Sequence, residues 1–467
     1  MASLSLTVMI NKEKTKVLFA EASSDFINVL LSFLTLPLGK IVTILQKHEG
    51  SELGSLTTLY KGLSELDTAH FSVPGAKEML LNPRSSFQPE YRQLPIDVTD
   101  TAPLLQYFLC EDVNCSQPSY DNISMYSDIA VCDCGGSLTR RIGIKDECRD
   151  GGEAFVVSPL FFIVTDDLRV VPIVSGIVQA LSDLGITDTR GAEMKSLSLG
   201  PYEIGELLKL SLTSATPLTD MVMKSNNKCP QSEVWLDHIH QHDAPTESNK
   251  IVIRAFLHES TNKFLFAEAS DEFVELLSSF LAIPLGGVEF LLAGNTPFKN
   301  IDNLYRSVSN GIDDKHFTTS DTKNRLVSPK LAHGYLPKNQ FLPLSEEGPP
   351  KLFYQATRKG LRYNYSSHEK EVTIDMVSSF KSSKEVYIKK QTMCFVSDDL
   401  TMSPSLTSRI SILNDGGIPL SEMKETEFHI GLNEALCILK ASLTSKTALT
   451  DGLIKPLLKR QPKKERC

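Results

Sequence analysis

The amino-acid sequence predicts an α+β protein made of two homologous domains. The first observation behind this prediction is an internal repeat: Leu-Phe-Ala-Glu-Ala-Ser occurs at residues 18–23 and again at residues 265–270, an offset of 247 positions. Between residues 18 and 39, 14 of 22 positions are identical in the second copy. The second observation is that hairpin strands and helices are grouped, instead of alternating as they do in parallel βαβ proteins. Each domain should contain an N-terminal β-hairpin followed by helices, then short strands and a closing amphipathic helix.

Each copy begins with the predicted β-hairpin and its helix. Residues 5–10 and 16–21 flank a polar turn in the first copy, and residues 251–257 and 263–268 do so in the second. A helix should follow, because apolar side chains recur at i, i+3, i+4, i+7 and i+8. These side chains are Phe26, Val29, Leu30, Phe33 and Leu34 in the first copy and Phe273, Leu276, Leu277, Phe280 and Leu281 in the second. Pro37 and Pro284 end these helices and suit the first turn of another.

Short strands and a closing helix are predicted further along. Residues 161–171 indicate two strands that turn at Asp166 and Asp167, and a helix should follow near residues 174–184. The closing helix of each copy carries apolar residues on one face. They are Ile204, Leu207, Leu208 and Leu212 in the first copy and Leu432, Ala435, Leu436, Leu439 and Leu443 in the second.

The repeat also indicates the domain boundaries. The offset between the copies falls from 246 at Pro83 to 232 at Asp166, so the first copy holds 14 additional residues there, in an interval with five of the nine cysteines. The segment between the copies is rich in Asn, His, Asp, Pro and Ser, which is typical of a linker. We therefore predict a first repeat domain with the cysteine cluster at 1–225, a linker at 226–248, a second repeat domain without the cluster at 249–454, and a basic tail at 455–467.

Composition and charge exclude several classes of protein. A hydrophobic content of 41% over 467 residues is enough for real cores, so fibrous and fully disordered classes are excluded. The 48 Lys and Arg against 57 Asp and Glu give a net charge of −9, opposite to that of a protein that coats nucleic acid or anionic membranes. The longest apolar runs fall short of the roughly 18 residues that a membrane span requires.

The ends of the chain bear on where the protein is expected to act. The first residues match neither a secretory signal nor a myristoylation site, so we expect a cytoplasmic protein with reduced cysteines. The basic tail is a candidate nuclear address or phosphate contact, and a charged tail can equally serve solubility. Its charged residues are Lys455, Lys459, Arg460, Lys463, Lys464 and Arg466.

Four cysteines are spaced as ligands of a structural zinc ion. Cys110-x4-Cys115 and Cys132-x-Cys134 supply four thiolates, and the two glycines that follow permit a tight turn that aims amide groups at sulfur. Four sulfur ligands leave no position for water, so such a zinc would be structural and not catalytic. The one-residue spacer is shorter than the usual two to about four residues, and Cys148 is an alternative to one of the four ligands. The alternative is that these residues are buried thiols that act as small hydrophobic side chains.

Repeated carboxylates are the candidates for catalysis. The Asp pairs at 166–167 and 398–399 suggest acid/base chemistry, although Asp at a turn between strands is the ordinary case. Glu21 and Glu268 occur at the hairpin-to-helix junction of both copies, where a carboxylate stabilises a helix N-terminus without doing chemistry. The sequence contains no Gly-rich phosphate loop, Rossmann fingerprint, zinc-protease helix, Gly-x-Ser-x-Gly elbow or kinase signature.

The repeated segments resemble a known family. Residues 16–39, their second copy, and the closing segment Leu-Cys-Ile-Leu-Lys-Ala-Ser-Leu-Thr-Ser-Lys-Thr-Ala-Leu-Thr-Asp at 436–451 are similar to segments of a plant family catalogued as a domain of unknown function, number six-seven-four. The resemblance covers nearly the whole chain. It implies a plant protein, usually with two tandem copies, in which a cysteine cluster recurs, and it implies no activity and no catalytic residue. Cys132-Asp-Cys134 departs from the Cys-x-x-Cys form of the family.

Three functional hypotheses follow. The preferred one is a non-enzymatic interaction or structural module with one structural zinc site, an unknown protein partner and pairing between its own two domains. The second is an enzyme with an unfamiliar carboxylate site between the domains. The third is a weak nucleic-acid binder that uses the tail or a zinc loop, which the net charge of −9 disfavours.

Overall fold

The computed structural model describes residues 3–460 with several gaps. The residues outside the described part are 1–2, 49, 74, 97–106, 113–114, 116–123, 125, 130, 133, 143–152, 175, 225–249, 337–339, 349–354, 358–359, 363–386, 390–393, 404–418 and 461–467. The predicted linker, Cys148 and the end of the basic tail therefore lie outside the described residues.

The first half of the chain forms a five-stranded antiparallel sheet with the order β6-β5-β2-β1-β7. Its strands are β1 (Leu4–Ile10), β2 (Val17–Ser23), β5 (Phe161–Thr165), β6 (Val170–Pro172) and β7 (Glu193–Leu199). Its helices are α1 (Ser24–Thr35), α2 (Leu38–Lys47), α3 (Gly54–Glu65), η1 (Thr68–His70), α4 (Ala76–Leu81), α5 (Gln88–Tyr91), α6 (Ile177–Asp183), α7 (Pro201–Thr213) and α8 (Pro217–Met223). A separate hairpin consists of β3 (Tyr107–Cys110) and β4 (Leu138–Ile142).

The second half forms a sheet with the corresponding order β13-β12-β9-β8-β14. Its strands are β8 (Ile251–His258), β9 (Phe264–Ala269), β12 (Cys394–Val396), β13 (Met402–Ser403) and β14 (Met423–Ile430). Its helices are α9 (Asp271–Ser279), η2 (Phe280–Ala282), α10 (Leu285–Leu291), α11 (Lys299–Arg306), η3 (Ser307–Gly311), η4 (Asp314–His316), α12 (Thr322–Val327), η5 (Leu420–Glu422), α14 (Leu432–Ser442), η6 (Thr450–Ile454) and α15 (Lys455–Arg460). Strands β10 (Gln355–Thr357) and β11 (Gly360–Arg362) form a small hairpin.

The predicted α+β class is confirmed, and its elements follow from simple periodicity. Alternate residues of β1, from Leu4 to Ile10, are buried, as are Ile251 and every second residue after it in β8. This period of two places one face of each sheet against the helices. The predicted hairpins, the helices after them and the turn at residues 166–167 are all present.

Each sheet also has an edge strand that the sequence did not indicate. β7 pairs with β1 along all seven of its residues, and β14 pairs with β8 along all eight. Five of the seven side chains of β7 and four of the eight of β14 are exposed, so the hydrophobic alternation that predicts strands is limited to the last residues of each strand. Charged side chains on both strands are suited to edges, where they discourage pairing with another chain.

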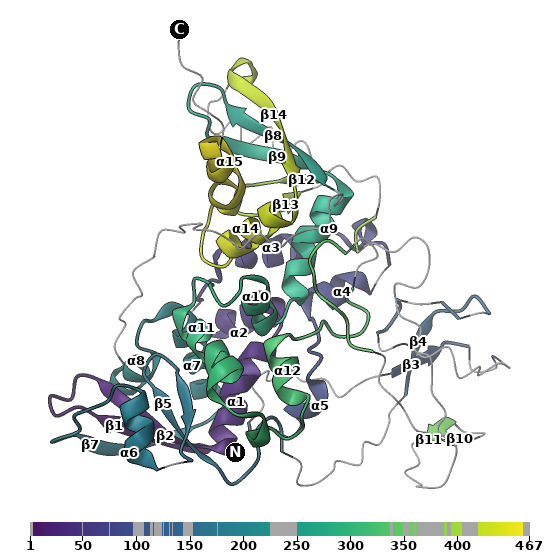
Figure 1. Ribbon diagram of the computed structural model, residues 1–467. Helices are drawn as coiled ribbons and strands as arrows, with labels where there is room; N and C mark the ends of the chain where they lie inside the picture. The colour runs from purple at the N-terminus through teal and green to yellow at the C-terminus, as the bar shows by residue number, and fades with distance from the viewer. Residues whose placement is uncertain are drawn as a thin grey trace.

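The two halves meet at their Pro-Leu-Gly segments. The backbone N–H of Leu38 donates to Ile283 O at 2.9 Å, and the N–H of Leu285 donates to Leu36 O at 2.9 Å. Figure 1 shows α1, α2, α10 and α11 between the first sheet at the lower left and the second sheet at the top. α1 is buried along nearly its whole length, because it packs on its own sheet and on α10 of the other half. One hydrophobic core therefore runs through both halves.

Helices are exchanged between the halves. α3 of the first half packs against α9, α14 and β13 of the second, and α11 of the second half packs against α1 and α7 of the first. Ser55 Oγ donates to Ser445 O at 2.6 Å, and Asn300 Nδ2 donates to Ser214 O at 2.7 Å. Each exchanged helix thus contacts the segment that follows the closing helix of the other half.

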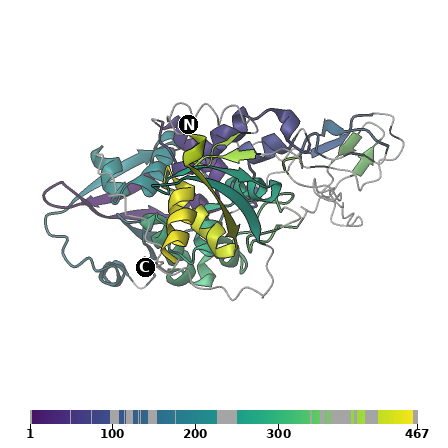
Figure 2. The ribbon, with the colours of Figure 1, turned by 90° about the horizontal axis from the view of Figure 1, so that it is seen from above.

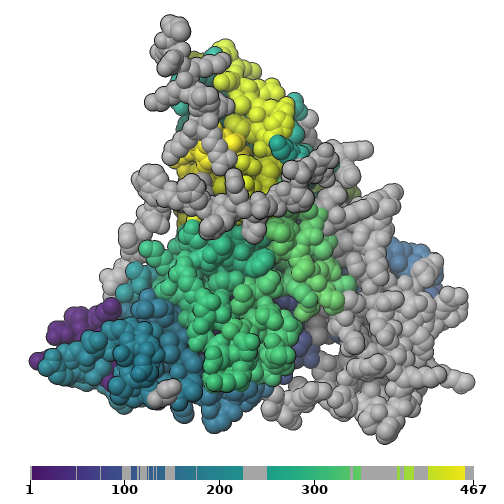
Figure 3. Space-filling model, in the orientation of Figure 1, coloured from purple at the N-terminus to yellow at the C-terminus, as the bar shows by residue number. Residues whose placement is uncertain are grey.

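Two backbone pairings reinforce this exchange. Ser72 N donates to Tyr387 O at 2.9 Å, and Lys389 N donates to His70 O at 2.9 Å. In the opposite direction, Val157 N donates to His316 O at 2.9 Å, and Thr318 N donates to Phe155 O at 2.9 Å. The repeated His-Phe segment of each half therefore pairs with residues near the third sheet strand of the other. Figure 3 shows the first-half residues in blue and teal in direct contact with second-half residues in green.

The predicted domain boundaries stay a prediction, because one hydrophobic core and the exchanged helices join the two halves.

The β3–β4 hairpin lies at the edge of the molecule in both ribbon views (Figures 1 and 2). Among the helices that the structure describes, none combines the length and the apolar composition of a membrane-spanning segment.

Candidate metal centre

The four cysteines lie on and around the β3–β4 hairpin. Cys110 is the last residue of β3 and pairs with Leu138 of β4 across an irregularity in the ladder. The turn before β4 is tight: Gly135 N donates to Cys132 O at 2.8 Å, and Cys132 N donates to Gly136 O at 2.8 Å. Gly135 has φ of +90°, a backbone conformation that glycine adopts without strain. This turn brings Cys132 and Cys134 next to the end of β3.

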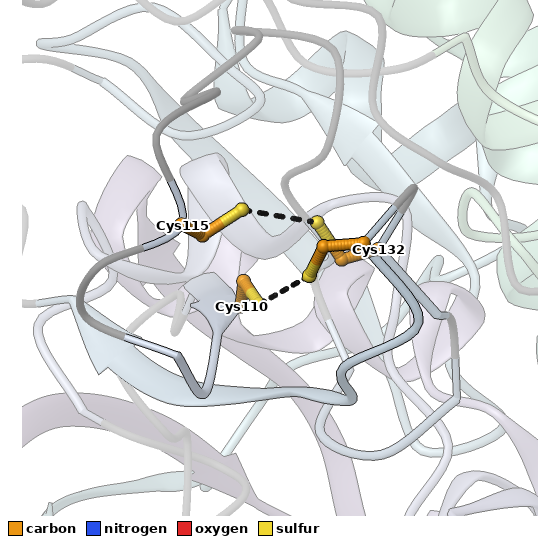
Figure 4. Close-up of side chains that lie close together, drawn as sticks. Cys110, Cys115 and Cys132 are labelled. Carbon is orange, nitrogen blue, oxygen red and sulfur yellow. Dashed lines mark hydrogen bonds between the residues drawn. The ribbon is translucent and has the colours of Figure 1, made fainter.

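The four sulfur atoms form one compact group. The Sγ atoms of Cys110 and Cys134 are 3.4 Å apart, and those of Cys115 and Cys132 are 3.8 Å apart. Figure 4 shows the side chains of Cys110, Cys115 and Cys132 turned toward one another. All four Sγ atoms lie within 4.8 Å of one another. Four ligands at about 2.3 Å from a tetrahedral zinc ion lie about 3.8 Å apart, so the observed sulfur spacing fits such an ion.

The surroundings of the sulfur atoms also suit a bound cation. Cys110 and Cys132 are buried, Cys115 is half-buried and Cys134 is exposed. Burial raises the pKa of the Cys110 thiol, whereas the backbone N–H of Gly136 donates to the Cys134 sulfur and lowers the pKa of that thiol. A divalent ion would stabilise the thiolate form of all four, because coordination requires the deprotonated sulfur.

The hairpin supports the cluster from two sides. Arg140 Nε donates to the carbonyl oxygen of Cys110 at 2.9 Å, and Glu111 N donates to Ser137 O at 2.9 Å. Phe108 and Leu138 complete a small apolar cluster with Cys110 and Cys132, separate from the main core. A Cβ atom at Gly136 would lie 3.0 Å from the Cys110 sulfur, so only glycine fits there without a shift. The hairpin therefore packs around the sulfur atoms and buries only a small apolar cluster.

The family follows from a comparison with known proteins. Residues 1–427 match the model of the family described as "Protein of unknown function (DUF674)". The chain belongs to this family. No curated protein and no solved structure matches the chain significantly. The resemblance noted from the repeated segments is thus confirmed at the level of the DUF674 family.

The repeated carboxylates that the sequence offers for catalysis do not gather in one site of this DUF674 protein. Glu21 is exposed on β2 of the first sheet, and Glu268 lies on β9 of the second, where Arg254 Nη2 contacts its carboxylate at 2.7 Å. The two glutamates lie in different sheets, so neither serves as the acid/base partner of the other.

The Asp pairs are turn residues with a structural role. Asp166 is 5% exposed and accepts from Thr219 N at 2.9 Å and from Thr219 Oγ1 at 2.6 Å. Asp398 accepts from the matching N and Oγ1 of Thr450, both at 2.7 Å. Burial raises the pKa of both carboxyl groups, and the Thr hydrogen bonds oppose that rise. The repeated Asp and Thr residues therefore attach the turn to the helix at the end of each half.

Sequence reasoning missed three features of the DUF674 chain. Glu289 and Asp302 form a buried carboxyl pair in the second half. Asn300 joins α11 to the end of α7. Lys40 and Arg84 line a pocket next to the cysteine hairpin. The sequence did contain a signal for the pocket. Directly after the identical Pro-Leu-Gly segment, the first copy has Lys40 where the second copy has Gly287.

Proposed function

We propose that this protein is a cytoplasmic, non-enzymatic interaction or structural module whose cysteine hairpin is held by one structural zinc ion. The observation that carries the proposal is the single group of Cys110, Cys115, Cys132 and Cys134 sulfur atoms within 4.8 Å of one another. Such an ion would contribute folding free energy where the hairpin buries little apolar surface. Four sulfur ligands would leave no coordination position for a substrate or a water molecule.

The arrangement of the two halves supports a role in binding or scaffolding. Both sheets have the same strand order, and the exchanged helices join them through equivalent contacts. We attribute this to duplication of one ancestral unit that paired with itself, with repeat domains at 1–225 and 249–454. The repeated polar residues at 166, 219, 398 and 450 serve this architecture, which supports a non-enzymatic role.

Zinc analysis of the purified full-length chain tests the proposal. We expect about one zinc ion per chain and not two, because the second half has no cysteine group of this kind among its described residues. Cys132→Ser should lower the zinc content several-fold and make the segment between Cys110 and Cys148 sensitive to protease, while the second sheet and its helices stay intact. Cys437→Ser is the matched control, since Cys437 is a buried thiol on α14 outside the cluster.

Two results would contradict the zinc site. One is an absence of zinc from protein prepared without chelator. The other is a Cys132→Ser protein that retains as much zinc as the Cys437→Ser control. In either case the four thiols would be small buried side chains, as the alternative hypothesis states.

A further inference from the structure

A pocket of about 490 Å³ lies between the helices of the first half and the cysteine hairpin. Its lining includes Lys40 of α2, Asn82 and Arg84 after α4, Tyr91 at the end of α5, and Phe108 and Tyr126 of the cysteine-bearing segment. A volume of this size falls in the range of small-molecule sites, which span roughly 300–1,000 Å³. The pocket has space for an organic molecule about the size of a bicyclic ring system.

Two cationic side chains line this pocket. Lys40 is 7% exposed, and its Nζ donates to Asn82 Oδ1 at 2.6 Å. The Arg84 guanidinium lies 4.6 Å from the centre of the Tyr126 ring, a distance that permits a cation–π contact. Arg84 Nη1 is buried and has no hydrogen-bond acceptor among the described residues. A guanidinium and an ammonium group in the lining of one pocket favour an anionic group there, which both cations bind through charge-assisted hydrogen bonds.

The acidic residues of the lining lie nearer to solvent. Glu78 is exposed and accepts from Asn82 Nδ2 at 3.3 Å, and Asp128 is half-buried. Positive charge is therefore carried by the more deeply buried Lys40, and the negative charge lies toward the rim. The remaining walls include the apolar side chains of Leu36, Met79 and Ile129.

The second copy shows that the fold does not require Lys40 and Asn82, whereas Lys330 keeps a cation at the position of Arg84. Gly287 occupies the position of Lys40 after the shared Pro-Leu-Gly segment, and Ser328 occupies the position of Asn82 before the shared proline. The first copy thus places a buried lysine next to its cysteine hairpin, at a position where the second copy has glycine.

We propose that this pocket binds a small organic carboxylate that also carries an apolar or aromatic part. The carboxylate accepts from the Arg84 guanidinium and from the Lys40 ammonium, and the apolar part lies against Phe108, Met79 and Ile129. This inference goes beyond the structural role proposed above, because it assigns a ligand class to the protein. It also places the ligand between the helical body and the cysteine hairpin, so a bound acid would join the two.

Calorimetric titration of the full-length, zinc-loaded protein with naphthoate and naphthamide tests the proposal. The two probes share their ring system and differ in the charge of the head group, so naphthoate should bind and naphthamide should bind at least about tenfold more weakly. Benzoate and phenylpropionate, each with its amide, extend the range of ligand size.

Variants of the two cations locate the site. Arg84→Gln and Lys40→Met should each weaken naphthoate binding about tenfold or more. Lys209→Met is the matched control, because Lys209 is a largely buried lysine on α7 that pairs with Glu206 outside the pocket. Lys40→Arg, which keeps the charge, should retain part of the affinity and guards against a loss that reflects misfolding.

Equal binding of each acid and its amide would overturn the proposal, as would acid binding that both cation variants leave unchanged. Failure of every acid in the panel to bind at millimolar concentration would also overturn it. These outcomes are separate from a failure of the zinc proposal, because the zinc content of each sample is measured alongside. Acid binding by a chain that contains no zinc would contradict the zinc site alone.

Discussion

At the scale of single residues, the second half contains a buried carboxyl pair that costs stability at neutral pH. Glu289 is fully buried and accepts from Thr296 Oγ1 at 3.0 Å, and the same hydroxyl lies 2.6 Å from Asp302 Oδ1. Burial raises the pKa of Glu289 well above its usual value, and the nearby charge of Asp302 raises it further. The first copy has Val42 at the position of Glu289, so the fold does not depend on this acid.

We predict that Glu289→Gln stabilises the protein near neutral pH. Because the folded-state pKa is raised, the neutral acid stabilises the fold below about pH 4.5, and this contribution is lost as pH rises through the folded pKa. The glutamine side chain keeps an oxygen that accepts from Thr296 but carries no charge. The free energy of unfolding of the variant should therefore exceed that of the wild type by about 1–3 kcal/mol near neutral pH.

Urea denaturation at two pH values checks this prediction. The gain from Glu289→Gln should shrink toward zero near about pH 4, where the wild-type carboxyl is protonated in both states. Glu259→Gln, at an exposed site just after β8, serves as the control and should show no such gain. A stability difference that does not change with pH would contradict the assignment of a neutral Glu289.

At the scale of secondary-structure elements, two glycines permit the central helices to meet. A Cβ atom at Gly286 of α10 would lie 2.9 Å from Leu34 O, and one at Gly39 of α2 would lie 3.2 Å from Leu281 O. Both contacts are to backbone atoms of the other half, which cannot move aside as a flexible side chain can. The repeated Pro-Leu-Gly segment is thus explained by a close approach between the two halves.

We predict that Gly286→Ala lowers the free energy of unfolding by about 1–3 kcal/mol, since an added methyl group must separate α10 from α1. Gly348→Ala is the control, because a Cβ atom there meets nothing within 4 Å. Thermal unfolding of the two variants measures the difference. A Gly286→Ala protein as stable as the control would show that the contact between the halves is looser than the structure indicates.

At the scale of the whole molecule, each half is covered in part by helices of the other half. α3 and α4 of the first half pack toward the second half, and α11 and α12 of the second half pack toward the first. A chain cut between the halves would lose only the connection, whereas an isolated half would expose the surfaces that these helices cover. The exchange makes the two copies mutually dependent for folding.

We therefore predict that residues 1–224 and 250–467, produced together as separate chains, form a stable heterodimer. The interface between the two fragments would contain the hydrophobic core that the halves share. Such a large apolar interface should keep the fragments together through size-exclusion chromatography. Each fragment produced alone should aggregate or pair with itself, because its exchanged helices lack their usual partner. Two fragments that each fold as stable monomers would contradict the exchange.

Local elements could be predicted from the sequence because their causes are local. The alternation of buried residues in β1 and the helical spacing from Phe26 to Leu34 depend only on chain geometry. The grouping of Cys110, Cys115, Cys132 and Cys134 could also be predicted, because short spacing and glycines after Cys134 bring the sulfur atoms together. The internal repeat predicted two units with the same arrangement of strands, and the two sheets have the same strand order.

The tertiary structure alone decided how these elements combine. Pairing of β7 with β1 leaves most of its side chains in solvent, so the strand carries no hydrophobic pattern to detect. The exchange of α3 and α11 arises from contacts between residues 390 and 86 positions apart. The apolar face of a helix predicts that the face is buried, but it does not predict which half of the chain covers it. Lys40 and Arg84 likewise lie in one pocket only because α2, the segment after α4 and the cysteine hairpin converge in space. Periodicity and spacing determine local structure, whereas long-range packing selects the partners.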